Sequence, residues 1–112
     1  MPVHVDYLVL GLGGIGLATV QGAKLASASK VIVSDPLPER RELAMRLGAT
    51  HTIDPNTEDV AAVCMALTDN IGVDYAFETA GLALLIEQGI QASRAGGMTV
   101  CVGAPPIDQG VK

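Results

Sequence analysis

A glycine-rich hexapeptide near the amino terminus constrains the fold of this chain more than any other feature. It has the pattern G-x-G-x-x-G and reads Gly11-Leu12-Gly13-Gly14-Ile15-Gly16. The hexapeptide follows an apolar run at residues 5–10 and opens a stretch of helical spacing that extends to about residue 26. A strand, a glycine turn and a helix in this order indicate a binding loop for a dinucleotide.

Each glycine of the pattern has a steric task in such a loop. Gly11 permits the tight turn from strand to helix, Gly13 lets a pyrophosphate approach the backbone, and Gly16 lets the helix lie close to the strand. The N–H groups at the helix start would then bind the phosphates without a lysine. The sequence has no Gly-Lys-Ser/Thr after the glycines, which argues against a triphosphatase loop.

An acidic residue stands about twenty residues further on, where a dinucleotide site requires one. Asp35 ends the apolar run at residues 31–34, and its carboxylate can accept hydrogen bonds from ribose hydroxyls. It would repel a 2′-phosphate, so it favours NAD over NADP. Arg40 and Arg41 follow closely, and their charges would weaken that preference. The simpler interpretation is that Asp35 only starts the turn before Pro36.

The rest of the chain alternates between short apolar runs and amphipathic stretches. We expect further strands at residues 30–34, 51–53, 73–77 and 98–102, with helices at 38–47, from 56 to 67 and from 82 to about 94. Strict alternation of this kind predicts an α/β domain with a doubly wound parallel sheet of about five strands and helices on both faces, a Rossmann fold. We expect one domain over residues 1–112, ending in a loop from about residue 104.

Several helix details follow from the same pattern. Gly48 should end the second helix, and Gly96 and Gly97 should end the fourth. Asn56 should cap the start of the third helix, where Asp59 would lie near the positive end of the helix dipole. We expect the following apolar or small residues to face the sheet: Ala18 and Gly22; Leu43, Ala44 and Leu47; Val60, Val63, Cys64 and Leu67.

The chain also resembles a known family over about residues 5–106. The segments that carry the resemblance are residues 9–17, Ser34-Asp35 with Glu39-Arg40, and residues 44–50, 72–78 and 96–103. They are similar to the coenzyme domain of zinc-containing alcohol dehydrogenases, in the medium-chain dehydrogenase/reductase superfamily. The resemblance implies an NAD-dependent oxidoreductase that transfers hydride between an alcohol and NAD, with zinc as Lewis acid.

The resemblance also assigns roles to single residues. Ile15 matches a branched residue behind the nicotinamide ring, and Arg40 a basic residue beside the ribose. Residues matching the adenine pocket are Pro36, Thr79 and Ala80, and those matching the backbone at the carboxamide are Val102, Gly103 and Ala104. The expected coenzyme contacts are therefore Gly11, Leu12, Gly13, Gly14, Ile15, Gly16, Asp35, Pro36, Arg40, Thr79, Ala80, Val102, Gly103 and Ala104.

The sequence also departs from the family. The family's zinc ligands come mainly from a separate upstream domain, so we expect no metal and no catalytic residue here, and an inactive fragment of a longer enzyme. Ser27 stands where a glycine usually closes the first helix, and Leu82 where some members carry an arginine. Without the family's sixth strand, the fifth would be an exposed edge that promotes self-association.

Other classes of function find little support. His4, His51, Cys64 and Cys101 match no zinc spacing, and we expect both cysteines to be buried. Neither Tyr7 nor Tyr75 has a lysine four residues later, and Glu78 is best explained as a structural carboxylate. Seven scattered basic residues against twelve acidic ones, a net charge of -5, argue against a nucleic-acid partner.

Composition also bears on location and on alternative functions. The uncharged stretch at residues 7–23 holds five glycines and suits neither a membrane span nor a signal peptide, so we expect a cytoplasmic protein. A stand-alone NAD-binding module that senses redox state would need the same loop and Asp35. A methyltransferase that binds S-adenosylmethionine is a third possibility, which the third glycine disfavours.

Overall fold

The structure of the protein, a computed structural model, describes residues 4–102. Strands and helices alternate from beginning to end within this range. The strands are β1 (Asp6–Leu10), β2 (Lys30–Ser34), β3 (His51–Ile53), β4 (Val73–Glu78) and β5 (Ser93–Cys101). The helices are α1 (Gly14–Leu25), α2 (Pro38–Leu47), α3 (Val60–Leu67) and α4 (Ala83–Ala92).

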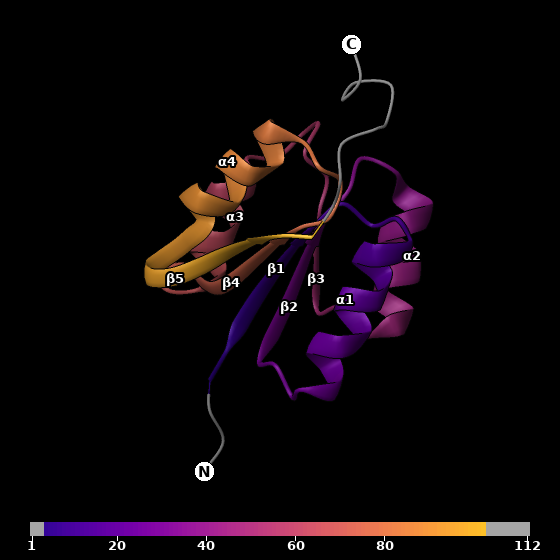
Figure 1. The fold of residues 1–112 in the computed structure, drawn as a ribbon, viewed down its shortest axis with the longest axis horizontal. Helices are drawn as coiled ribbons and strands as arrows, with labels where there is room; N and C mark the ends of the chain where they lie inside the picture. Colours follow the sequence, from indigo (N-terminus) through magenta and orange to yellow (C-terminus); the bar gives the residue numbers. More distant parts are fainter. Residues whose placement is uncertain (1–3, 103–112) are drawn as a thin grey trace.

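The five strands form one parallel sheet in the order β3-β2-β1-β4-β5. Helices α1 and α2 cover one face of this sheet and α3 and α4 cover the other (Figure 1). The expected Rossmann fold is therefore confirmed. The chain reverses its direction of winding between β1 and β4, and in sheets of this type ligands bind in the crevice at that point.

The middle parts of the central strands β1 and β2 are apolar because both faces of the sheet are covered. Leu8 and Leu10 belong to the core cluster that packs against α3 and α4, where Val60 and Cys64 are also buried. Val9, between the two leucines, belongs to the opposite cluster. That second cluster includes Val20, Ala23 and Ala44 from α1 and α2, so two separate cores sandwich the sheet.

The junction between α4 and β5 differs from the expectation. Helix α4 ends at Ala92 and β5 begins at Ser93, so Gly96 and Gly97 lie within the strand rather than closing the helix. In the register, Ser93 pairs with Val73 but Met98 pairs with Tyr75, which leaves residues 94–97 to bulge opposite one residue of β4.

The bulge has identifiable causes. Arg94 Nε donates a hydrogen bond of 2.6 Å to Asp74 Oδ1, which fixes the start of the bulge on β4. A side chain at Gly97 would stand 3.0 Å from the carbonyl oxygens of Arg94 and Asp74. Gly97 thus permits a close backbone approach within the strand. Gly96, with a φ of 79°, has a backbone conformation that favours glycine.

The third helix starts at a different residue than expected. The N-cap of α3 is Asp59, whose carboxylate accepts a hydrogen bond of 3.0 Å from the N–H of Ala62. Asn56 instead lies in the preceding turn, where its own N–H donates to Asp54 Oδ1 at 3.0 Å. Asn56 and Asp59 are both able to cap a helix, but Asn56 belongs to the turn at Asp54, so Asp59 is the N-cap.

Two expected helix faces were partly wrong. Helix α1 packs on the sheet through Gly16, Val20 and Ala23, a stripe at spacings of four and three, which leaves Ala18 and Gly22 exposed. In α2, Ala44 is buried and Leu47 packs against the core, but Leu43 is 38 % exposed. The stripe on α3 is confirmed, with Val60 and Cys64 buried and Val63 and Leu67 packed beside them.

The ends of the first two helices are as the sequence indicates. Gly48 caps α2 with a φ of 129°, a value that suits glycine. Ser27, two residues beyond α1, has a φ of 61° in the left-handed region, although it is not a glycine. Ser27 therefore has a backbone conformation that glycine favours.

Candidate functional site

The glycine loop is a tightly packed turn between β1 and α1. Gly11 has a φ of 92°, and its N–H donates to the carbonyl oxygen of Ser34 at 2.9 Å. A Cβ at Gly11 would lie 2.9 Å from Thr79 Oγ1, and one at Gly16 would overlap the carbonyl oxygen of Gly11. The expected steric tasks of these two glycines, a tight turn and a close approach of helix to strand, are therefore confirmed.

The middle of the loop is open. A Cβ at Gly13 or Gly14 would meet no atom within 4 Å. Gly13 is the N-cap of α1, no side chain caps this helix end, and the first turn carries no acidic residue. The free N–H groups and the positive end of the helix dipole at this place favour an anionic ligand.

Asp35 connects the glycine loop after β1 with the loop after β2. Its side chain is 4 % exposed, Oδ2 accepts from the N–H of Leu12 at 2.8 Å, and Oδ1 accepts from the N–H of Leu37 at 2.9 Å. The bond to Leu37 is the turn that the simpler interpretation predicted, and the bond to Leu12 adds a contact with the glycine loop. Each carboxylate oxygen has a second lone pair, so both can still accept from a ligand hydroxyl.

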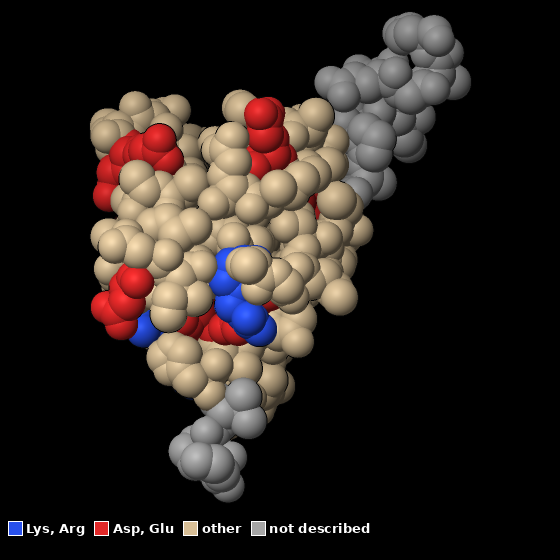
Figure 2. Space-filling model, turned by 90° about the vertical axis from the view of Figure 1, so that its left-hand side faces the viewer, with Lys and Arg blue, Asp and Glu red and all other residues tan. Residues whose placement is uncertain are grey.

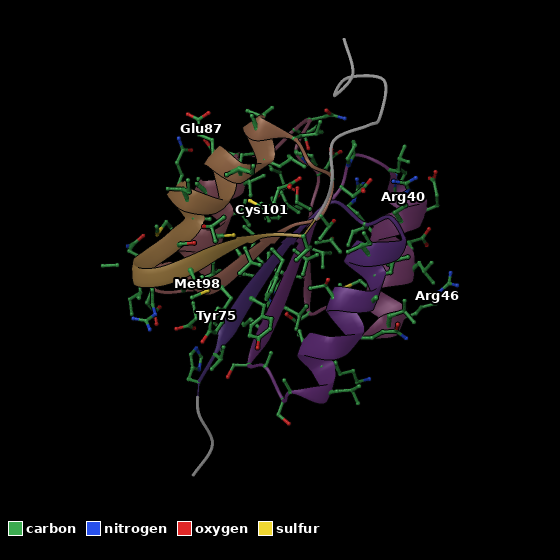
Figure 3. The ribbon with its side chains drawn as sticks, viewed as in Figure 1. Arg40, Arg46, Tyr75, Glu87, Met98 and Cys101 are labelled. Carbon is green, nitrogen blue, oxygen red and sulfur yellow. The ribbon has the colours of Figure 1, made fainter. Side chains whose placement is uncertain are left out.

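The two arginines after Asp35 have different surroundings. Arg41 Nη1 donates to the carbonyl oxygen of Asp35 at 2.8 Å and lies 3.9 Å from Asp54 Oδ1, with its side chain 18 % exposed. Arg40 Nη1 lies 3.7 Å from Asp35 Oδ2, and its side chain is 48 % exposed. Arg40, labelled on α2 in Figure 3, is therefore the cation that can move toward a ligand at Asp35.

The loop after β4 closes the other side of the crevice. Thr79 Oγ1 lies 2.7 Å from the carbonyl oxygen of Gly11 and 3.0 Å from that of Leu10, and can donate to either. Glu78 is fully buried, and its Oε2 accepts from the N–H groups of Ala80 and Leu82 at 2.8 and 3.1 Å. Glu78 thus shapes the loop, as expected of a structural carboxylate.

These loops enclose a cavity of about 460 Å³ at the carboxyl ends of the strands. Of the residues expected to contact coenzyme, the cavity brings together Gly11, Leu12, Gly13, Asp35, Pro36, Arg40, Thr79 and Ala80. It is also lined by Leu82, whose position the resemblance puts near the coenzyme, and by residues that sequence reasoning missed: Leu37, Pro55, Asn56, Leu84, Leu85 and Gln88. The loop after β3 was a foreseeable wall, since every parallel strand ends at this edge of the sheet.

The remaining expected residues lie elsewhere. Gly14, Ile15 and Gly16 begin α1 and do not line this cavity; Ile15 is 53 % exposed and Gly16 is buried. Val102 is also exposed and does not line the cavity. Gly103 and Ala104 fall outside the described residues. The expected nicotinamide end of the site is thus not enclosed by residues 4–102.

The tyrosines and cysteines considered in the sequence analysis do not line this cavity. Tyr7 packs with Tyr75 and Phe77, with ring centroids 5.4 and 5.6 Å from its own. Cys64 is buried, and burial raises the pKa of its thiol from 9.0 to about 12. The expectation that Cys101 is buried was wrong, because it lies on the edge strand and is exposed. Within residues 4–102, no three His, Cys, Asp or Glu side chains form a group that could hold a metal ion.

Basic residues do not gather into a large patch on the face shown in Figure 2. On the side that carries α4 and β5, basic atoms occupy a small central area beside acidic ones, and most of the surface is uncharged (Figure 2). None of the helices in the described part of the chain has the length and apolar character that crossing a membrane requires.

The chain matches a known protein family over most of its length. The family model described as zinc-binding dehydrogenase matches residues 14–111. The chain belongs to the zinc-binding dehydrogenase family. A relative from a Pseudomonas species named "Probable alcohol dehydrogenase" is 43 % identical over 101 residues, which are 90 % of this chain and 32 % of the relative.

Solved structures of the family show the same fold. The alcohol dehydrogenase zinc-binding domain protein from Burkholderia ambifaria superposes with a TM-score of 0.88 at 37 % identity, over 98 % of this chain and 29 % of that one. A structure from Sinorhizobium meliloti 1021, described as a zinc-binding dehydrogenase bound to NADP, has a TM-score of 0.83 at 39 % identity, covering 98 % and 32 %. This zinc-binding dehydrogenase chain thus spans about a third of the length of its relatives.

Proposed function

We propose that this chain is the coenzyme-binding domain of a zinc-type dehydrogenase and that it binds NAD(H). The observation that carries the proposal is the buried carboxylate of Asp35, which is bonded to the glycine loop and lines the cavity at the switch point of the sheet. A carboxylate that served only the turn at Leu37 would not need to reach Leu12.

The residues present fit a dinucleotide. The open backbone at Gly13 and the uncapped end of α1 suit the pyrophosphate, because no side chain obstructs them. The free lone pairs of Asp35 suit the hydroxyls of the adenosine ribose. The apolar part of the cavity, with Leu37 and Leu85 among its walls, suits the adenine ring. We propose that Gly14 and Ile15, with Val102, Gly103 and Ala104, meet the nicotinamide half.

We propose NAD rather than NADP as the preferred coenzyme. A 2′-phosphate would have to stand beside the carboxylate of Asp35, which is buried and therefore poorly screened. Arg40, at 3.7 Å, offsets part of this repulsion and can move because its side chain is half exposed. The preference should therefore be moderate in size.

The longer protein that this family implies would transfer hydride between an alcohol and the coenzyme. Zinc bound by residues of that longer protein outside the present chain would supply a Lewis acid for the alcohol oxygen. The contribution of this chain is to hold and orient the coenzyme, and we expect no dehydrogenase activity from the chain alone. Hydride transfer measured with the purified chain would contradict this part of the proposal.

Calorimetric titration of the chain with NADH, NADPH and S-adenosylmethionine tests the proposal. We expect NADH to bind most tightly. In Asp35→Asn, NADH affinity should fall by about 10-fold, because a hydrogen bond to a charged group is lost, and NADPH affinity should fall less. Glu39→Gln, which removes an exposed acid from the first turn of α2, should change neither affinity. A folded chain that binds S-adenosylmethionine, or neither coenzyme, would overturn the proposal.

We also propose that copies of the chain pair along β5. This strand is an edge of the sheet formed by residues 4–102, and Met98 on it is 56 % exposed. An exposed apolar edge strand tends to pair with another chain. Light scattering should show species larger than a monomer that disappear in Met98→Lys, and a monodisperse monomer at high concentration would count against pairing.

For the compartment, we propose the cytoplasm. The support is that Cys64 and Cys101 are both free and that Cys101 is exposed, which suits a reducing environment. Fractionation of the native host with an antibody to the chain would test this.

A further inference from the structure

One polar side chain in the wall of the cavity, that of Gln88, has an amide oxygen with no hydrogen-bond partner among residues 4–102. Gln88 lies in the middle of α4 and lines the cavity beside Leu84 and Leu85. Its Oε1 atom is buried and accepts no hydrogen bond from any of residues 4–102. A buried amide oxygen without a partner is unfavourable, and a ligand group that bonds to it would remove this cost.

The position of Gln88 indicates which part of a dinucleotide would meet it. Asp35 and the glycine loop define the ribose and pyrophosphate end of the cavity. The cavity is also lined by Pro55 from the loop after β3 and by Leu84 and Leu85 of α4, which are apolar. A flat heteroaromatic base has apolar faces and a polar edge, and these walls offer it apolar contacts with one carboxamide.

A glutamine carboxamide matches the edge of adenine in particular. Its oxygen accepts from an exocyclic amino group while its N–H donates to a ring nitrogen, and this pairing is the common way in which glutamine recognises adenine. Rotation about the terminal torsion exchanges the two ends of the amide, and that torsion has a shallow, roughly two-fold preference. The buried oxygen can thus be turned toward the cavity without moving α4.

We propose that Gln88 is a specificity-determining residue that hydrogen-bonds the amino edge of adenine in the bound coenzyme. This inference rests on the proposed coenzyme function and adds to it a residue that selects the base. The pairing would also give the buried Oε1 of Gln88 the partner that it lacks among residues 4–102.

Two neighbouring side chains offer comparisons. Asn56 is an exposed amide in the loop after β3 that lines the same cavity. Gln91 lies on the next turn of α4, is exposed, and does not line this cavity; it borders an adjoining hollow that Gln88 also borders. A variant of Gln91 therefore changes the same chemical group on the same helix without touching the cavity.

The test is a pair of calorimetric titrations, with NADH and with reduced nicotinamide purine dinucleotide, in which hydrogen replaces the 6-amino group of adenine. The wild-type chain should bind NADH roughly 5- to 10-fold more tightly, the value of one hydrogen bond. Gln88→Leu should bring this ratio close to 1, while Gln91→Leu should leave it unchanged. A residue needed only for folding would not alter a ratio between two ligands.

The other outcomes separate this inference from the proposed function. If the wild-type chain binds both dinucleotides equally, or if the ratio survives Gln88→Leu, NAD(H) binding stands and the role of Gln88 is overturned. If Asn56→Leu abolishes the ratio instead, the loop after β3 reads the base and Gln88 does not. If the folded wild-type chain binds neither dinucleotide, both proposals fail together.

Discussion

The hydroxyl group of Thr79 lies 2.7 Å from the carbonyl oxygen of Gly11, so the loop after β4 is tied directly to the turn after β1. The two residues are 68 positions apart in the chain and meet because their strands are neighbours in the sheet. The bond spans the point where the winding of the sheet reverses. It therefore holds together the two sides of the crevice in which we place the coenzyme.

Thr79→Val should weaken this connection without changing the shape of the side chain. We expect a loss of about 1 kcal/mol in the free energy of unfolding, because the part-buried carbonyl oxygen of Gly11 loses this donor, and a weaker affinity for NADH. Thr79→Ser keeps the hydroxyl and should retain most of both. Urea denaturation followed by titration with NADH measures the two effects, and equal behaviour of Val and Ser variants would refute the role of the hydroxyl.

Two glycines of the loop should respond to alanine in opposite ways. Gly16→Ala should destabilise the fold by about 3 kcal/mol or more, because the new methyl group would overlap the carbonyl oxygen of Gly11. Gly13→Ala meets no protein atom within 4 Å and should cost under about 1 kcal/mol of stability as an N-cap change.

For NADH binding we expect a marked effect of the Gly13 variant, although its effect on stability is the smaller of the two. Gly13→Ala should reduce NADH affinity by roughly tenfold or more, since its methyl group would occupy the approach of the pyrophosphate to the backbone. Thermal denaturation and calorimetry on the same samples separate the two effects. Unchanged NADH binding by a folded Gly13→Ala chain would argue against phosphate contact at this residue.

Ser27→Gly should stabilise the protein. Ser27 has a φ of 61°, and a residue with a Cβ in the left-handed region carries a steric cost that glycine avoids. After allowing for the greater freedom of glycine in the unfolded chain, the gain should be about 0.5–1 kcal/mol. Ala26→Gly, at a φ of -80°, is the matched control and should destabilise instead. The comparison requires only the denaturation midpoints of the two variants.

Stability should decline at high pH partly because of Cys64. Its thiol ionises near 9.0 when exposed in the unfolded chain and near 12 in the folded protein. Below pH 9 both states keep the proton and the thiol has no effect on the balance. Between about pH 9 and 12 the unfolded state releases its proton first, so the free energy of unfolding falls as pH rises.

The variant Cys64→Val isolates this effect from other groups that ionise at alkaline pH. Its unfolding free energy should fall less steeply above pH 9 than that of the wild type. A maleimide should modify the exposed Cys101 of the native protein rapidly and Cys64 only after denaturation. Parallel alkaline declines in both proteins would mean that Cys64 does not ionise on unfolding.

Local patterns in the sequence were sufficient for the order of elements and for the steric roles of Gly11 and Gly16. Both depend on residues close together in the chain, and the turn before α1 has few alternatives once its glycines are placed. Asp35 was identified for the same reason, because its spacing from the loop is set by the length of one βα unit.

Features that depend on the assembled sheet could not be predicted in this way. Cys101 lies in an apolar run like those of the central strands, and only the order of the strands makes its position an edge. Gln88 stands far from the glycine loop in sequence and joins the cavity because α4 folds back beside it. The face of α1 that packs was also misjudged, since the stripe through Val20 and Ala23 is apolar but so is the exposed Ala18.

The position of β1 at the centre of the sheet has a consequence for how the molecule opens. β1 is bonded on both sides, by β2 and β4, and its residues Leu8 and Val9 are completely buried between the two cores. The backbone amide protons of β1 should therefore exchange with deuterium only when the whole domain unfolds, whereas those on the outer side of β5 exchange through local fluctuations. The glycine loop begins one residue beyond β1, so the residues that would bind phosphate are attached to the part of the protein that opens last.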